Sequence, residues 1–180
     1  MAAAKTRSLE EVDAVLQAGL THIGYNYVQE ALPIIDKIGN RAKWHMIGHL
    51  QRNKAKITVE KFDMIETVDS WKLAKTLENR CMELDKTMPV LIEINSGRED
   101  NKTGIYPEDV MALVESMTKL KYVQIKGLMT MGPRFGDPED SRPYYKTTYK
   151  IFQELTNLNL PNVEMKDRKS TRLNSSHRIR

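Results

Sequence analysis

Short apolar runs alternate with longer, helix-like segments along most of this 180-residue chain. Such alternation, at intervals of roughly 20–30 residues, is typical of a parallel sheet with crossover helices. No G-x-G-x-x-G or P-loop motif follows any of the runs, which disfavours an open nucleotide-binding sheet. We therefore expect an α/β fold of the (β/α)8 TIM-barrel type, with its site at the C-terminal ends of the strands. The barrel should be incomplete, with about six to seven units present; the expected strands are Ala2–Ala4, Thr21–Gly24, Trp44–Ile47, Phe62–Ile65, Val90–Ile94, Tyr122–Met129 and a seventh from Val163.

The segments between the runs carry recognisable helix signals. Ser8 and Glu11 have the spacing of a capping box, and Gly19 lies where the first helix would end. The second helix, from about Asn26, contains Pro33, which should break or kink it.

Composition narrows the class of protein. The hydrophobic fraction is 40%, and no apolar run approaches the roughly 18 residues of a membrane span. Since the first residues lack the pattern of a secretory signal and Cys81 has no cysteine partner, we expect a cytoplasmic protein without disulfides. His45 and His49 are four apart, but Gly48 indicates a strand ending in a turn, so we expect no metal site.

The basic charge is concentrated at the C-terminal end. Residues 166–180 hold six Lys or Arg and one acid, so residues 1–165 carry −1 of the total charge of +4. Nucleic-acid binding would therefore rest on this segment alone. The segment lacks apolar periodicity and resembles the conceptual translation of a sequencing-library adapter; a disordered basic arm is the alternative. We expect residues 1–165 to form a partial barrel and residues 166–180 to be a disordered tail.

Lys5 follows a run of three alanines, so it should stand at the mouth of the barrel with room beside it for a planar ligand. A lysine amine becomes a Schiff-base nucleophile when burial or a nearby cation favours its neutral form. On residue chemistry alone, a lysine near a chain end is more often a solvated charge.

Four motifs favour a functional role for Lys5 over a solvated charge. In chain order they are Lys5-Thr6-Arg7, the segment 24–30 (GYNYVQE), the segment 44–54 (WHMIGHLQRNK) and the segment 127–133 (GLMTMGP). Together they resemble the pyridoxal phosphate homeostasis protein family, and the likeness covers nearly all of residues 2–165. The resemblance implies a single barrel like the N-terminal domain of alanine racemase. It also implies that this barrel binds pyridoxal 5′-phosphate (PLP). The implied cofactor-binding residues are Lys5, through a Schiff base, with Asn26, His49 and Met129 beside it.

The chain departs from the family pattern in three ways. Tyr25 stands where the family usually has Glu, the chain starts almost at Lys5, and the segment after Met165 replaces loops that cradle the PLP phosphate in the family. The resemblance therefore implies a barrel truncated at both ends, which binds PLP weakly or not at all.

Two functions follow from the resemblance. The first is a non-catalytic PLP carrier, monomeric, that serves PLP-dependent apoenzymes and binds neither membrane nor nucleic acid. The alternative is an amino-acid racemase, which needs a second acid–base group opposite Lys5. Tyr144 and Tyr145 are the tyrosines that the chain offers for that position.

Overall fold

The computed structural model describes residues 1–132 and 137–171. Within that part of the chain, seven strands form one parallel sheet in the order β1-β2-β3-β4-β5-β6-β7, as expected for an incomplete (β/α)8 barrel. The strands are β1 (Ala2–Ala3), β2 (His22–Tyr25), β3 (Lys43–Met46), β4 (Met64–Val68), β5 (Met88–Ile94), β6 (Val123–Met131) and β7 (Val163–Thr171).

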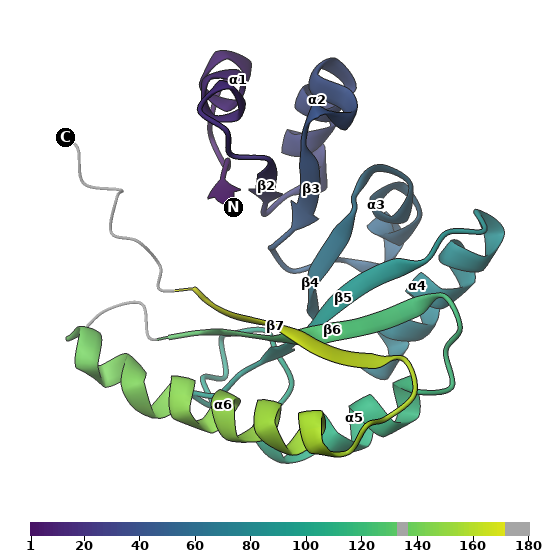
Figure 1. The fold of residues 1–180 in the computed structure, drawn as a ribbon, viewed down its shortest axis with the longest axis vertical. Coiled ribbons are helices and arrows are strands. Elements are labelled where there is room, and N and C mark those ends of the chain that lie inside the picture. Colours follow the sequence, from purple (N-terminus) through teal and green to yellow (C-terminus); the bar gives the residue numbers. More distant parts are fainter. Residues whose placement is uncertain (133–136, 172–180) are drawn as a thin grey trace.

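Helices connect the strands and lie outside the curved sheet (Figure 1). The α-helices are α1 (Leu9–Gln17), α2 (Val28–Ile38), α3 (Ala55–Lys61), α4 (Trp71–Glu83), α5 (Val110–Met117) and α6 (Arg142–Asn157). Short 3-10 turns precede or follow them: η1 (Gly39–Arg41), η2 (Arg52–Lys54), η3 (Pro107–Asp109) and η4 (Pro138–Ser141).

The first two helices can be compared with the capping box and the proline break or kink expected from the sequence. The capping box at the start of α1 is confirmed, since Ser8 Oγ accepts from the Glu11 backbone and Glu11 accepts from the Ser8 backbone. Of the expected break or kink at Pro33, the break is wrong, because α2 runs through this residue. Proline removes one backbone donor from the helix, and the buried face of α2, formed by Val28, Ala31, Ile35 and Ile38, holds it against the sheet.

The C-terminal strand extends beyond the expected domain boundary. A disordered tail was predicted from residue 166, but β7 continues to Thr171 and pairs with β6 from Gly127↔Asp167 to Met131↔Thr171. Strand pairing uses backbone groups, and the unpaired N–H and C=O groups of a sheet edge are a template for pairing with another segment. Gly127, at φ +156°, allows the approach, since a Cβ there would overlap the Asp167 carbonyl. Residues 172–180 lie outside the described residues.

The sheet has two buried faces. The main core lies between the sheet and the helices and includes Ile65, Ile92 and Leu128. Their chain neighbours Met64, Leu91 and Met129 form a separate cluster, with Met131 packed against it. Because side chains alternate across a strand, this second cluster lies on the inner face of the sheet, inside the barrel.

Candidate functional site

Three of the residues expected to bind the cofactor follow consecutive strands at their C-terminal ends. Lys5 comes two residues after β1, Asn26 directly after β2, and His49 three residues after β3. The register aligns these ends, pairing Ala3 with Gly24 and Tyr25 with Met46. The Ala4 N–H donates to the Gly24 carbonyl at 2.8 Å, which fixes the backbone before the half-buried Lys5.

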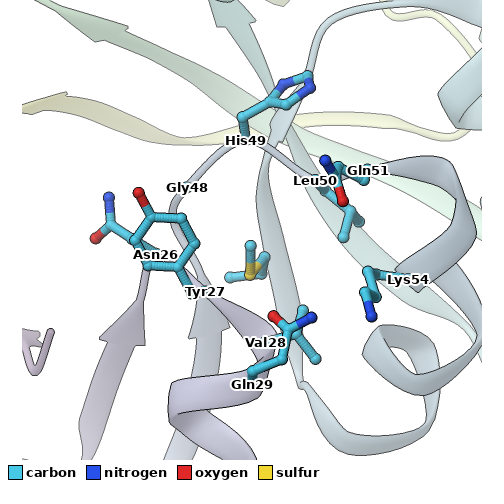
Figure 2. A pocket seen from close by; sticks show the side chains of 10 residues that line it. Asn26, Tyr27, Val28, Gln29, Gly48, His49, Leu50, Gln51 and Lys54 are labelled. Atoms are coloured by element: carbon cyan, nitrogen blue, oxygen red, sulfur yellow. The ribbon is translucent and has the colours of Figure 1, made fainter.

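A pocket of about 250 Å³ lies between the loops that follow β2 and β3. Figure 2 shows Asn26 and Tyr27 on one side of it and Gln51 and Lys54 on the other, with His49 at the rim. The structure therefore brings Asn26 and His49 to one pocket. The amides, the imidazole and the lysine amine around it suit a polar or anionic ligand group.

Gly48 sets the spacing of the two loops. A Cβ at this position would overlap the backbone of Asn26, including its carbonyl oxygen. The Gly48 carbonyl in turn accepts a hydrogen bond from Thr67 Oγ1 at 2.7 Å, which ties the loop to β4. The close approach of Gly48 to Asn26 thus shapes the pocket.

An acidic group lies beside the rim. Asp69, directly after β4, has Oδ2 at 3.9 Å from His49 Nδ1. The Asp69 side chain is 18% exposed and the His49 side chain 51% exposed. The polar rim therefore extends from β2 and β3 to the end of β4.

Lys5 and Met129 do not line this pocket. Lys5 stands one strand away, after β1, and Met129 belongs to the inner cluster with Met64 and Leu91. Asn26 and His49 therefore line one pocket, Lys5 lies at the end of the neighbouring strand, and Met129 lies in the apolar cluster on the inner face of the sheet.

Tyr25, where the family usually has Glu, does not belong to the rim. It is buried in the main core, with its ring centroid 6.3 Å from that of Trp44. Position 25 therefore contributes to packing between the sheet and the helices.

Two buried carboxylates inside the barrel were missed by the sequence reasoning. Glu66 on β4 and Glu93 on β5 are each 2% exposed. Burial raises the pKa of Glu93 to about 7, the nearby Asp69 adds to this, and a hydrogen bond from Thr103 opposes it. Burial would also raise the pKa of Glu66, but hydrogen bonds from His45 and Lys169 outweigh it and the pKa is lowered. The available signal was an acid between apolar residues of a strand, clear in β5 and weaker in β4, where Thr67 follows Glu66.

Neither a metal centre nor a membrane span emerges from residues 1–132 and 137–171. The His, Cys, Asp and Glu side chains there form no group of three suited to a metal ion. None of the described helices is long and apolar enough to cross a bilayer.

Comparison with known proteins agrees with this architecture. Residues 2–175 match the family described as alanine racemase, N-terminal domain. The pyridoxal phosphate homeostasis protein of Aquifex aeolicus is 35% identical over 169 residues, which is 92% of this chain and 74% of the relative. The protein of the same name from Pasteurella multocida is 33% identical over 158 residues, 86% of this chain and 68% of the relative.

Solved structures of PipY and of alanine racemase have a similar fold. PipY of Synechococcus elongatus PCC7942 without PLP superposes with a TM-score of 0.86 at 30% identity, covering 92% of this chain and 78% of PipY. PipY with PLP bound gives a TM-score of 0.83 at 28% identity, covering 93% and 78%. Alanine racemase of Clostridium difficile 630 shares the fold alone, with a TM-score of 0.75 at 15% identity over 89% of this chain and 41% of the enzyme.

The parallel barrel with a lysine after its first strand is thus of the class formed by alanine racemase N-terminal domains. Within that class, the chain belongs to the pyridoxal phosphate homeostasis protein family.

Proposed function

We propose that this chain binds PLP through a Schiff base between the cofactor aldehyde and the amine of Lys5. The observation that carries the proposal is the position of Lys5, half-buried at the C-terminal end of β1, in a chain whose relative PipY has been solved with PLP bound. The carboxyl ends of barrel strands are where such folds place their ligands. The link would replace the aldehyde oxygen by nitrogen and release one water.

The residues around the mouth fit this cofactor. The inner cluster of Met64, Leu91 and Met129 offers an apolar floor for a planar ring. Asn26 and His49 offer hydrogen-bonding groups at the rim. Glu93 adds a buried carboxyl oxygen that has no partner among the described residues. When bound, PLP supplies an aldehyde for the covalent link and an electron-withdrawing ring.

The proposed role is that of a carrier, which keeps PLP bound and passes it to PLP-dependent apoenzymes in the cytoplasm. The curated names of the relatives from Aquifex aeolicus and Pasteurella multocida support this role. We further propose that the carrier acts as a monomer, with the open mouth of a single barrel giving recipients access to the cofactor.

Trapping the adduct tests the proposal. The purified protein is mixed with PLP, its absorbance spectrum is recorded, and borohydride reduction is followed by mass spectrometry of the modified lysine. We expect a reduced adduct on Lys5 that is lost in Lys5→Ala and kept in Lys56→Ala, which removes an exposed lysine of α3. Labelling spread over surface lysines, unchanged in Lys5→Ala, would contradict the proposal.

The position of Tyr145 favours a second candidate function, that of an amino-acid racemase. The Tyr145 hydroxyl lies 3.1 Å from where a Cβ of Gly132 would be, so α6 brings a phenol to the C-terminal end of β6. A racemase needs acid–base groups on both faces of the substrate α-carbon. Exchange of the α-hydrogen of alanine with deuterium, dependent on both PLP and Tyr145, would favour the enzyme over the carrier.

A further inference from the structure

Glu93 occupies an unusual place for a carboxyl group. It lies on β5 two residues after Leu91, so both side chains point to the inner face of the sheet. Its cross-strand neighbour on β6 is Met129, a member of the same inner cluster as Leu91. Glu93 is therefore set into the apolar floor of the barrel, close to the C-terminal end of β5.

Only one of the two carboxyl oxygens is engaged within the described residues. Thr103 Oγ1 donates to Glu93 Oε1 at 2.9 Å, while Oε2 is buried without a hydrogen-bond partner. Leaving a buried polar atom unpaired costs about 1–3 kcal/mol, and such atoms are uncommon in folded proteins. The arrangement therefore calls for a partner that residues 1–132 and 137–171 do not supply.

The backbone around Glu93 is held firmly. Ile105 N–H donates to the Glu93 carbonyl at 2.9 Å, and Asn95 N–H donates to the Ile105 carbonyl at 2.9 Å. The segment that contains Thr103 is thus tied to the end of β5. Because this frame fixes both the strand and the donor to Oε1, the position of Oε2 is set before any ligand arrives.

The charges near Glu93 indicate what the partner must offer. Asp69, at the end of β4, is the charged side chain that most affects Glu93, and it disfavours a second negative charge there. Within the described residues, Thr103 is the hydrogen-bonding side chain that faces Glu93, and it donates to the oxygen already engaged. The free oxygen therefore suits an N–H or O–H donor and disfavours a phosphate.

The position of β5 relative to β1 adds a geometric argument. β5 is the fourth strand along from β1, and strands four places apart face each other across the interior of an eight-stranded barrel. In a closed barrel of that kind, the strand ends that carry Lys5 and Glu93 lie on opposing walls. In a pyridine ring attached to Lys5 through C4, the ring nitrogen is para to the attachment and points away from Lys5, whereas the hydroxyl on C3 lies beside it.

We propose that Glu93 is a further ligand-binding residue of the barrel, whose free Oε2 forms a hydrogen bond with a ring O–H or N–H of the bound aromatic ligand. This rests on the proposed function, since it takes the pyridine ring of PLP as the ligand. The two donors of that ring are its phenolic hydroxyl and its protonated nitrogen.

A probe without an aldehyde separates this proposal from the Schiff base. 4′-Deoxypyridoxine 5′-phosphate keeps the ring nitrogen, the phenolic hydroxyl and the phosphate, but it cannot react with Lys5. Its dissociation constant is measured by calorimetry for the wild-type chain, Glu93→Leu and Glu93→Gln. Glu66→Gln is the matched control, because it alters another buried carboxylate of the inner face whose hydrogen bonds are made within the protein.

We expect Glu93→Leu to weaken probe binding about tenfold, as for the loss of one good hydrogen bond. Glu93→Gln, which keeps an acceptor oxygen, should retain most of the affinity, and Glu66→Gln should bind like wild type. Repeating the titration with the 3-methoxy analogue assigns the donor: loss of the Glu93 effect indicates the hydroxyl, and its retention indicates the ring nitrogen.

Two results would overturn the proposal: no measurable binding of the probe by wild type, or equal binding by wild type and Glu93→Leu when circular dichroism shows both to be folded. Failure of the Schiff base has a different signature. In that case the borohydride adduct on Lys5 is absent while the probe still binds in a manner that depends on Glu93.

Discussion

His45 Nδ1 and Glu66 Oε1 lie 2.6 Å apart inside the barrel, with side chains only 7% and 3% exposed. The two residues come from adjacent strands, β3 and β4, and Lys169 of β7 also contacts Glu66. One carboxylate thus joins the third, fourth and seventh strands of the sheet.

Replacing Glu66 should therefore destabilise the fold. Glu66→Ala removes the acceptor for His45 and Lys169, so we expect the free energy of unfolding at pH 7 to fall by roughly 1–3 kcal/mol. Because the pKa of Glu66 is lowered from 4.5, its contribution is present above pH 4.5 and is lost as the pH falls through the lowered value. Urea unfolding at pH 7 and pH 3 measures both effects. Glu60→Ala, at an exposed position of α3, should change neither, and an equal loss in both variants would refute the interpretation.

Glu93 should have the opposite dependence on pH. Its folded-state pKa of about 7 lies above the usual 4.5, so the folded protein binds a proton more tightly than the unfolded chain. Stability contributed by the protonated form is therefore complete below pH 4.5 and is lost as the pH rises to about 7, by about 3 kcal/mol in total.

Glu93→Gln cannot ionise and should remove this dependence. Unfolding without PLP at pH 5 and pH 8 should show that wild type loses more stability between the two values than the variant does. Parallel curves would mean that Glu93 ionises without penalty in the folded state.

The pocket residues should contribute to affinity in modest steps. Asn26→Ala and His49→Ala each remove one polar group from the same pocket, and we expect PLP binding to weaken by about 2–10-fold for each. Titration followed by the absorbance of the bound cofactor gives the dissociation constants. Lys75→Ala, on the exposed side of α4, is the control, and an affinity unchanged in both pocket variants would exclude the pocket from the site.

Gly48→Ala should disturb the pocket through the backbone. The added methyl group would overlap the main chain of Asn26, which cannot rotate away, so we expect a loss of roughly 1–3 kcal/mol in the free energy of unfolding. Gly24→Ala is a matched comparison, because its methyl group would meet only the side chain of Ile47, with Cδ1 at 2.8 Å. If Gly24→Ala costs more than Gly48→Ala, rigid contact with Asn26 is not what requires glycine at position 48.

Much of the fold was predictable from the sequence, since strand runs and helix caps are local signals. The capping box of Ser8 and Glu11 shows this well. Pro33 shows the limit, because the cost of a lost backbone donor is local whereas the packing that offsets it is contributed by the sheet. The length of β7 could not be predicted from the sequence either, because it depends on pairing with the edge of β6.

The site was predictable only in part. Lys5, Asn26 and His49 follow apolar runs, and a parallel sheet brings the ends of such runs to one edge. Glu93 also lies in an apolar run, but the sequence does not say that one of its oxygens has no partner in the part of the chain that the structure describes. The fold brings Thr103 to only one of the two oxygens and places the charge of Asp69 nearby, and neither contact can be read from the sequence.

The pairing of β7 with β6 shows that a segment without an apolar pattern can still form a strand. Residues 166–171 are largely polar, yet they continue the sheet in register with β6. The template is the row of amides and carbonyls along β6, which is the same whatever side chains come alongside it. The edge of β6 thus supplies backbone partners to a segment whose own side chains are mostly polar, and main-chain pairing extends the sheet of this chain to Thr171.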